Sequence, residues 1–250
     1  MSSPFSLEGR TAIVTGANTG IGQAIAVALA QSGAKVAAVG RSAMNETMEL
    51  INDEDRVHPI RADLSDTANL APLVDEAAEW GGGVDILVNN AGIIRRNDAL
   101  DFTEDDWDAV MDTNLKSAFF LSQAAARHMK PRGGGRIVNI ASLLSFQGGI
   151  RIASYTASKS GLAGLTRLLA CEWAPLGINV NAVAPGYVVT NNTQALRDDP
   201  QRYQAILDRI PAGRWAKPAD IAGAVVYLAS DAASYVHGIV LPVDGGWLAR

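Results

Sequence analysis

The stretch TAIVTGANTGIGQAIAVALAQ, residues 11–31, contains a β-branched run, a glycine-rich turn and a helical apolar pattern in direct succession. It predicts a strand at Thr11–Thr15 and a helix from about Gly20 to Gln31. Glycines at this spacing let the backbone approach a pyrophosphate at the positive end of the helix. Such a turn can arise by chance, but its position between strand and helix favours dinucleotide binding. The predicted contacts are Gly16, Asn18, Thr19, Gly20, Ile21 and Gly22.

The rest of the chain repeats this alternation of short strands and longer helical patterns. Further strands are predicted at Lys35–Val39, Val57–Arg61, Asp85–Val88, Arg136–Ala141, Ile178–Ala184 and Gly238–Val243. Strands separated by helices indicate an α/β Rossmann-type fold, with a doubly wound parallel sheet of about seven strands and helices on both faces. Pro242 predicts that the last strand lies at an edge. No repeat or linker divides residues 1–250, so we expect a single domain.

Composition excludes several classes of function. The chain has 250 residues, 48% of them hydrophobic, and a net charge of −5, which argues against nucleic acid and anionic membranes as partners. No apolar run reaches transmembrane length and the amino terminus does not resemble a signal peptide, so we expect a cytoplasmic protein. The single Cys171 is expected to be buried, and His58, His128 and His237 lack metal-ligand spacing. We therefore predict no metal site.

The end of the second predicted strand bears on cofactor choice. An acid there would bind a ribose 2′-hydroxyl, but the sequence reads Val39-Gly40-Arg41-Ser42. Arg41 and Ser42 can hold a 2′-phosphate, which favours NADP(H) over NAD(H). The alternative is that Arg41 stacks on adenine in an enzyme that accepts either cofactor.

The ends of the next two strands also carry candidate cofactor residues. Asp63, followed by Leu64, is placed to accept from the adenine amino group or to cap the following helix. Asn90, Ala91 and Gly92 follow the fourth strand, where a cofactor crosses the sheet or a polar turn forms.

Tyr155 and Lys159 lie four residues apart in a predicted helix that starts near Ala153, so they share one helix face. An adjacent ammonium stabilises a phenolate, and such a tyrosine can exchange a proton with a hydroxyl or carbonyl. A solvated helix face is the alternative for this pair taken alone. Asn114 falls in another predicted helix, which Thr103 caps; asparagine is a poor helix former and needs a reason there.

The segments Thr15–Gly22 and Asn89–Gly92, followed by Asn114, Ser142, Tyr155 and Lys159, resemble the short-chain dehydrogenase/reductase family over essentially the whole chain. The resemblance implies that Tyr155 is the acid/base and that Lys159 lowers its pKa and binds the nicotinamide ribose. It implies that Ser142 steadies the substrate oxygen and that Asn114 holds a water in a proton relay. Contacts to the nicotinamide carboxamide are implied for Pro185, Gly186, Val188 and Thr190. The carboxyl end, residues 243–247, resembles the family's subunit-contact edge, which implies a homotetramer.

Four stretches resemble the members of this family that act on sugar acids: residues 93–96, 145–151, 190–193 and 209–215. That resemblance implies hydride transfer at a secondary alcohol or ketone, with a substrate loop around residues 187–215. Arg95, Arg96 and Arg151 are the candidates for binding the acid, besides Ser142 and Tyr155 at the reacting oxygen, and Arg214 is the reserve candidate. Arg95 and Arg96 are adjacent and point opposite ways in an extended segment, so one of them is expected to reach the pocket.

Three alternatives stay open on the sequence. One is activity on gluconate or a deoxygluconate, and another is reduction of a 3-oxoacyl thioester with the same catalytic residues. The third is a catalytically silent cofactor-binding protein, which would have no need of the complete set Asn114, Ser142, Tyr155 and Lys159.

Overall fold

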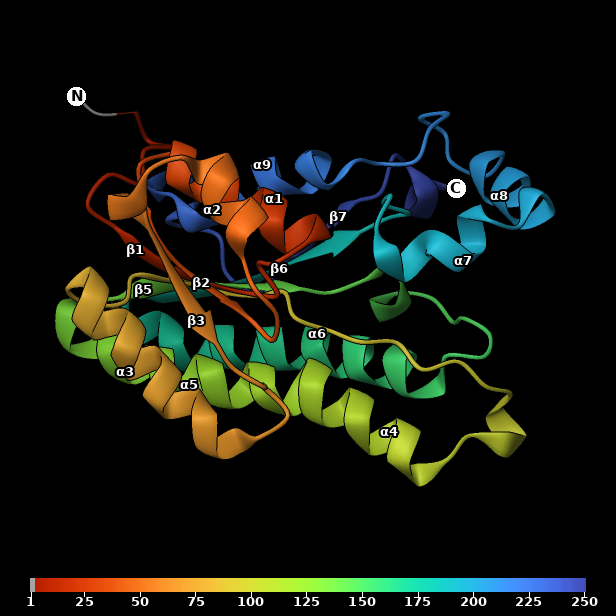
Figure 1. Cartoon of the computed structure of the whole chain (residues 1–250), viewed down its shortest axis with the longest axis horizontal. Coiled ribbons are helices and arrows are strands. Elements are labelled where there is room, and N and C mark those ends of the chain that lie inside the picture. Colours follow the sequence, from red (N-terminus) through yellow and green to blue (C-terminus); the bar gives the residue numbers. More distant parts are fainter. Residues whose placement is uncertain (1–2) are drawn as a thin grey trace.

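A seven-stranded, fully parallel sheet forms the centre of the molecule (Figure 1). The computed structural model describes residues 3–250. The strand order is β3-β2-β1-β4-β5-β6-β7. The strands are β1 (Thr11–Thr15), β2 (Lys35–Gly40), β3 (Val57–Arg61), β4 (Ile86–Asn89), β5 (Gly135–Ile140), β6 (Ile178–Pro185) and β7 (Val240–Val243). The predicted doubly wound sheet is confirmed, and β7, which carries Pro242, lies at an edge as expected.

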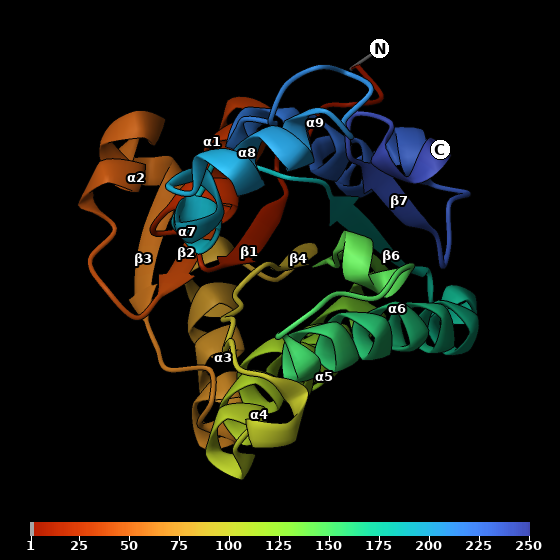
Figure 2. The ribbon, with the colours of Figure 1, turned by 90° about the vertical axis from the view of Figure 1, so that its right-hand side faces the viewer.

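Helices cover both faces of this sheet (Figures 1 and 2). They are α1 (Gly20–Gln31), α2 (Asn45–Ile51), α3 (Leu70–Gly81), α4 (Glu104–Met111), α5 (Ser117–Met129), α6 (Ala153–Trp173), α7 (Gln194–Arg197), α8 (Pro200–Leu207) and α9 (Pro218–Ala229). One apolar layer packs α1 and α9 on the sheet, and a second packs α3, α5 and α6 on the opposite face. With both faces covered, β1 and β6 are buried along their whole length, which explains their nearly continuous small and β-branched sequences.

The helix that contains Asn114 differs from the expected regular helix. Thr103 caps α4 as predicted, because its Oγ1 accepts from the Asp106 amide at 3.2 Å. The segment Asp112–Lys116 then forms a π-helical turn before α5 begins. One extra residue is thus inserted into the turn that carries Asn114, a type of irregularity that is frequent at functional sites.

Two further observations concern burial. Cys171 is exposed on α6, so the expectation that it is buried is wrong; the apolar spacing of this long helix did not identify which face meets the core. Among residues 3–250, no helix combines the length and the apolar character that are needed to cross a membrane.

The topology places a crevice at the carboxyl ends of the central strands. From β1 the chain winds outward through β2 and β3, and then returns to place β4 on the other side of β1. The loops that leave β1 and β4 therefore diverge at this point. Ligands of open α/β sheets bind outside the carboxyl ends of strands at such a reversal.

Candidate active site

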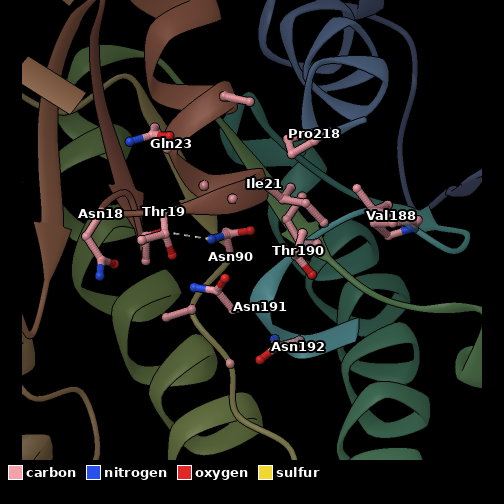
Figure 3. Close-up of a pocket in the computed structure, with 18 of the residues that line it drawn as sticks. Asn18, Thr19, Ile21, Gln23, Asn90, Val188, Thr190, Asn191, Asn192 and Pro218 are labelled. Carbon is pink, nitrogen blue, oxygen red and sulfur yellow. Dashed lines mark hydrogen bonds between the residues drawn. The ribbon is translucent and has the colours of Figure 1, made fainter. Parts of the chain in front are cut away.

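A cavity of about 1330 Å³ opens at these carboxyl ends. Figure 3 shows Asn18 and Thr19 on one side of it, Val188 and Thr190 on the other, and Asn90 between them. The cavity is lined by every residue predicted to bind the cofactor: Gly16, Asn18, Thr19, Gly20, Ile21, Gly22, Arg41, Ser42, Asp63, Leu64, Asn90, Ala91, Gly92, Tyr155, Lys159, Pro185, Gly186, Val188 and Thr190. Segments that follow six different strands, β1 to β6, thus meet in one place.

The glycine-rich turn is held tightly against the end of β4. The Asn90 side chain donates from Nδ2 to the Thr15 carbonyl at 2.8 Å, and Thr15 Oγ1 accepts from the Asn90 and Ala91 amides. A Cβ atom at Gly22 would lie 2.1 Å from the Gly16 carbonyl oxygen and 2.3 Å from Asn90 Nδ2, so only glycine fits. Gly16 also has a φ of 67°, which a side chain disfavours. The turn is a preformed cradle for a pyrophosphate at the amino end of α1.

The adenosine end of the cavity has no carboxylate directly after β2. Asn18 donates from Nδ2 to Ser42 Oγ at 2.8 Å, which holds the loop after β2 against the glycine-rich turn. Asp63 accepts from the Ser65 amide at 3.0 Å and from Ser65 Oγ at 2.8 Å, and these bonds lower the pKa of its carboxyl. Asp63 therefore stabilises the turn after β3 and also lines the cavity. It does not cap α3, which begins at Leu70. These residues fit a dinucleotide with or without a 2′-phosphate.

Ser142, Tyr155 and Lys159 converge at the other end of the cavity. Lys159 Nζ donates to the Ile140 carbonyl at 2.6 Å and lies 5.7 Å from the centre of the Tyr155 ring. Burial lowers the pKa of Lys159 to about 8. Burial raises the pKa of Tyr155, while a hydrogen bond with Ser142 and the charge of Arg96 act in the opposite direction. Burial is the largest of these effects, so the pKa of Tyr155 lies above its ordinary value.

Asn114 lies behind the cavity wall and does not line the cavity. Its side chain is 2% exposed and pairs with both backbone groups of Ile93, accepting from the amide at 2.8 Å and donating to the carbonyl at 3.0 Å. It also donates to Ser158 Oγ at 3.3 Å. Asn114 thus joins the loop after β4 to α6, and this contact is the structural reason for an asparagine in the π-helical turn.

The four arginines considered for an anionic substrate have different environments. Arg95 pairs with Asp106 at 3.1 Å, Arg151 pairs with Asp98 at 3.1 Å, and Arg214 forms a two-point bond with Asp220. Arg96 has no carboxylate partner among residues 3–250; it donates to the Asn192 carbonyl at 3.1 Å. Its charge also reaches the Tyr155 hydroxyl, since it lowers the pKa of that group. None of these four arginines is part of the cavity lining, but Arg96 is bonded to Asn192, which is.

Several lining residues were not predicted as site residues. They include Ile93 and Ile94 after β4, Thr113 before Asn114, Asn191 and Asn192 after Thr190, and Lys217 before α9. All but Lys217 are sequence neighbours of predicted site residues, so adjacency was the available signal. Lys217 reaches the cavity because α9 packs closely on α1, a tertiary contact that the sequence pattern did not reveal.

Comparisons with known proteins agree with this geometry. A family model described as enoyl-(acyl carrier protein) reductase matches residues 16–248. The chain is 57% identical over 250 residues to 2-dehydro-3-deoxy-D-gluconate 5-dehydrogenase of Escherichia coli, covering 99% of each chain. A solved structure from Agrobacterium tumefaciens, named for 2-deoxy-D-gluconate 3-dehydrogenase and carrying bound NADP, is 58% identical, with a TM-score of 0.94 and 100% coverage of both chains. One from Beutenbergia cavernae, named for NAD(P)-dependent gluconate 5-dehydrogenase with bound NADP, is 54% identical, with a TM-score of 0.95 over 99% of this chain and 100% of that one.

Proposed function

This chain belongs to the short-chain dehydrogenase/reductase family, and we propose that it acts as a 2-dehydro-3-deoxy-D-gluconate 5-dehydrogenase. It moves a hydride between a nicotinamide cofactor and the C5 alcohol or ketone of the sugar acid. The observation that carries this proposal is the bond of Arg96, which has no carboxylate partner among residues 3–250, to the carbonyl of Asn192 in the cavity lining. An oxidoreductase with a cation at this point is suited to an anionic substrate.

The cofactor proposed is NADP(H), with NAD(H) as the alternative. The glycine-rich turn would hold the pyrophosphate, Arg41 and Ser42 the adenosine ribose, and Asp63 and Leu64 the adenine side. Lys159 would hold the nicotinamide ribose, and Pro185, Gly186, Val188 and Thr190 the carboxamide. When bound, the nicotinamide supplies the hydride acceptor or donor. Bound NADP in the Agrobacterium and Beutenbergia relatives supports this choice.

Tyr155 is the proposed acid/base. In the oxidation direction its phenolate takes the proton of the C5 hydroxyl, and in the reduction direction its hydroxyl returns that proton to the C5 oxygen. Ser142 positions the same oxygen through its hydroxyl, and the charges of Lys159 and Arg96 favour the phenolate when it forms. Asn114 is proposed to complete a proton path through a water, in addition to holding Ile93.

The substrate carboxylate is assigned to Arg96, and residues 187–215 are proposed as the substrate loop. Arg95 and Arg151 are committed to Asp106 and Asp98, so they are weaker candidates for the same task. Arg96 also bonds to Asn192 in the substrate loop, so the same side chain would connect the acid, the loop and Tyr155. A guanidinium binds a carboxylate with two parallel hydrogen bonds, which favours a sugar acid over a neutral substrate.

A second candidate is a gluconate 5-dehydrogenase, which the similarity to the Beutenbergia protein favours. Both candidates share the cofactor, the catalytic residues and an anionic sugar acid. Reduction of a 3-oxoacyl thioester is disfavoured, because an arginine beside the reacting centre suits an acyl chain poorly. A catalytically silent role is disfavoured by the convergence of Ser142, Tyr155 and Lys159 in one cavity.

A cytoplasmic homotetramer is proposed as the working form. An apolar surface patch covers α5 and α6; it consists of Leu115, Phe119, Phe120, Gly161, Gly164, Leu165 and Leu168, with Lys116 at its margin. Strand β7 forms a separate open edge of the sheet. Two independent self-complementary surfaces are what a tetramer with dihedral symmetry requires.

A substrate panel tests the proposal. Formation of reduced nicotinamide is followed at 340 nm, the usual absorbance of these cofactors, with 2-dehydro-3-deoxy-D-gluconate, gluconate, 2-deoxygluconate and a 3-hydroxyacyl thioester; the Tyr155→Phe variant serves as a blank. We expect the largest kcat/KM for 2-dehydro-3-deoxy-D-gluconate and loss of turnover in the blank. A larger value for gluconate would favour the second candidate, and turnover of the thioester alone would overturn both.

A further inference from the structure

We propose that Arg61, at the end of β3, is a second cation of the 2′-phosphate subsite, so that this subsite spans two neighbouring strands. The proposal deepens the assigned use of NADP(H) and rests on it. Arg61 is not part of the cavity lining, and it is separated from Arg41 by the whole of α2 and β3 in the chain. The end of the second strand alone would therefore not have identified it.

The register of the sheet places Arg61 beside the loop that follows β2. Gly40, the last residue of β2, pairs with Arg61 on β3. Register partners on neighbouring parallel strands direct their side chains to the same face of the sheet. Gly40 has no side chain, and the Asn18 side chain lies close to the space that one would occupy: a Cβ at Gly40 would lie 3.2 Å from Asn18 Oδ1. Asn18 therefore lies over Gly40, and Arg61 extends from the adjacent strand on the same face of the sheet.

A direct contact joins the two arginines. Arg61 Nε donates to the backbone carbonyl of Arg41 at 3.0 Å. That bond fixes the backbone of Arg41 and holds the Arg61 guanidinium beside it. The rest of the Arg61 fork, its two terminal nitrogens, makes no hydrogen bond within residues 3–250. Arg61 is therefore both a positioning residue for Arg41 and a free donor at the same corner.

The charges at this corner are not neutralised by the protein. Seven arginines of residues 3–250 form ion pairs with carboxylates, but neither Arg41 nor Arg61 is among them. The nearby carboxylate of Asp63 is bonded to Ser65 and feels the charge of Arg41. Neither guanidinium is therefore engaged in an ion pair within residues 3–250, so both remain available to an anion.

Hydroxyl chemistry at the same place fits a phosphate. Ser42 Oγ accepts from Asn18 Nδ2 at 2.8 Å, which leaves the Ser42 hydroxyl proton free to donate. A phosphate dianion accepts several hydrogen bonds and pairs with guanidinium groups in a two-point geometry. A bare ribose 2′-hydroxyl accepts at most two hydrogen bonds and carries no charge to pair with the guanidinium groups. The corner therefore discriminates between NADP(H) and NAD(H) through Arg41, Ser42 and Arg61 together.

Binding of two fragments to the full-length protein tests this inference without turnover. 2′-Phospho-ADP-ribose and ADP-ribose differ only in the 2′-phosphate, and their dissociation constants are measured by titration calorimetry. Arg61→Met should weaken binding of 2′-phospho-ADP-ribose about tenfold, the effect of losing one charge-assisted hydrogen bond, and of ADP-ribose less than about twofold. Arg167→Met, an exposed arginine on α6 outside the cavity lining, controls for the change in net charge and should leave both constants within about twofold.

A charge-preserving variant sharpens the result. Arg61→Lys keeps the positive charge but loses the planar fork, so we expect a loss of only about threefold for 2′-phospho-ADP-ribose. Equal weakening of both fragments by Arg61→Met, no weakening of either, or a Lys variant as weak as the Met variant would each overturn the proposal. This result does not depend on the substrate. If the wild-type protein oxidises the sugar acid with NAD, and Arg61→Met does not discriminate between the two fragments, the inference on Arg61 is wrong but the proposed function stands. If Arg61→Met weakens only 2′-phospho-ADP-ribose, but the wild-type protein oxidises no sugar acid, the proposed substrate is wrong and the inference on Arg61 stands.

Discussion

Lys159 is a buried residue whose charge is altered by the fold. Burial lowers its pKa to about 8, whereas a lysine in the unfolded chain titrates near its ordinary value of 10.5. Between these two values the unfolded state binds more protons than the folded state, so this group makes the folded state more stable as pH rises. From pH 7.5 to pH 10 the gain is about 2 kcal/mol relative to a variant without the amine.

Urea unfolding of the wild type and of Lys159→Met at both pH values measures this gain. The free energy of unfolding of the wild type, minus that of Lys159→Met, should be about 2 kcal/mol larger at pH 10 than at pH 7.5. Taking the difference removes the contributions of other titrating groups, which the two proteins share. A difference that does not change with pH would show that Lys159 is solvated and has an ordinary pKa.

Arg96 is the residue on which substrate choice depends. Arg96→Met should raise KM for the sugar acid. The corresponding loss of binding free energy should be about 1.5–3 kcal/mol, the usual size for a hydrogen bond to a charged group. Methionine keeps an apolar stem, so packing should change little. Steady-state kinetics with the sugar acid and with an uncharged ketone separate the two effects, because only the acid engages the guanidinium.

The adjacent Arg95→Met is the matched control for this variant. It removes the same charge one residue away, but from a side chain already paired with Asp106, and KM should stay within about twofold. Losses of the same size on the acid and on the ketone would mean that Arg96 acts only by holding the Asn192 carbonyl.

The residue scale also shows what the sequence could and could not predict. Tyr155, Lys159 and Ser142 could be placed, because their chemistry requires particular side chains at particular spacings. The partners of the arginines could not, because Arg95, Arg151 and Arg214 lie on loops whose course has no periodicity. The raised pKa of Tyr155 was also missed, since desolvation depends on packing around the ring.

At the scale of elements, the turn between β1 and α1 is the least tolerant of change. Gly22→Ala would place a Cβ 2.1 Å from the Gly16 carbonyl oxygen, so the turn must open. We expect cofactor affinity to fall at least about tenfold and stability to fall by about 1–3 kcal/mol, as for overpacking in a close-packed site. Fluorescence titration with NADPH and urea unfolding measure the two effects.

Gly223→Ala in α9 is the matched control, because a Cβ there has no heavy atom within 4 Å. It should leave affinity within about twofold and add up to about 1 kcal/mol of helix propensity. A Gly22→Ala protein with unchanged cofactor affinity would show that this turn does not hold the pyrophosphate.

Periodicity and glycine chemistry predicted the order and type of the elements well. Strands β1 and β3 begin and end as predicted, and the end of β1 is marked by Gly16. The π-helical turn at Asp112–Lys116 was not predicted, since one inserted residue barely disturbs a helical pattern. Asn114 was the only signal of that irregularity.

At the scale of the whole molecule, the apolar patch on α5 and α6 predicts the oligomeric state. Leu168 is 50% exposed in the patch, and a glutamate there would introduce a charge into the proposed contact between copies. Leu168→Glu should therefore convert the tetramer into smaller species in light scattering coupled to gel filtration. Leu100→Glu, at an exposed leucine outside the patch, should leave the mass unchanged. A tetramer that survives Leu168→Glu would place the subunit contacts elsewhere.

The central claim is that this protein transfers the hydrogen at C5 of the sugar acid as a hydride, with Tyr155 taking the hydroxyl proton. The most direct measurement uses 2-dehydro-3-deoxy-D-gluconate labelled with deuterium at C5, oxidised NADP and mass spectrometry of the reduced cofactor. The account predicts that the reduced cofactor carries one deuterium and that none forms with Tyr155→Phe. Reduced cofactor without deuterium, or the absence of any reduced cofactor from the wild-type protein, would contradict it.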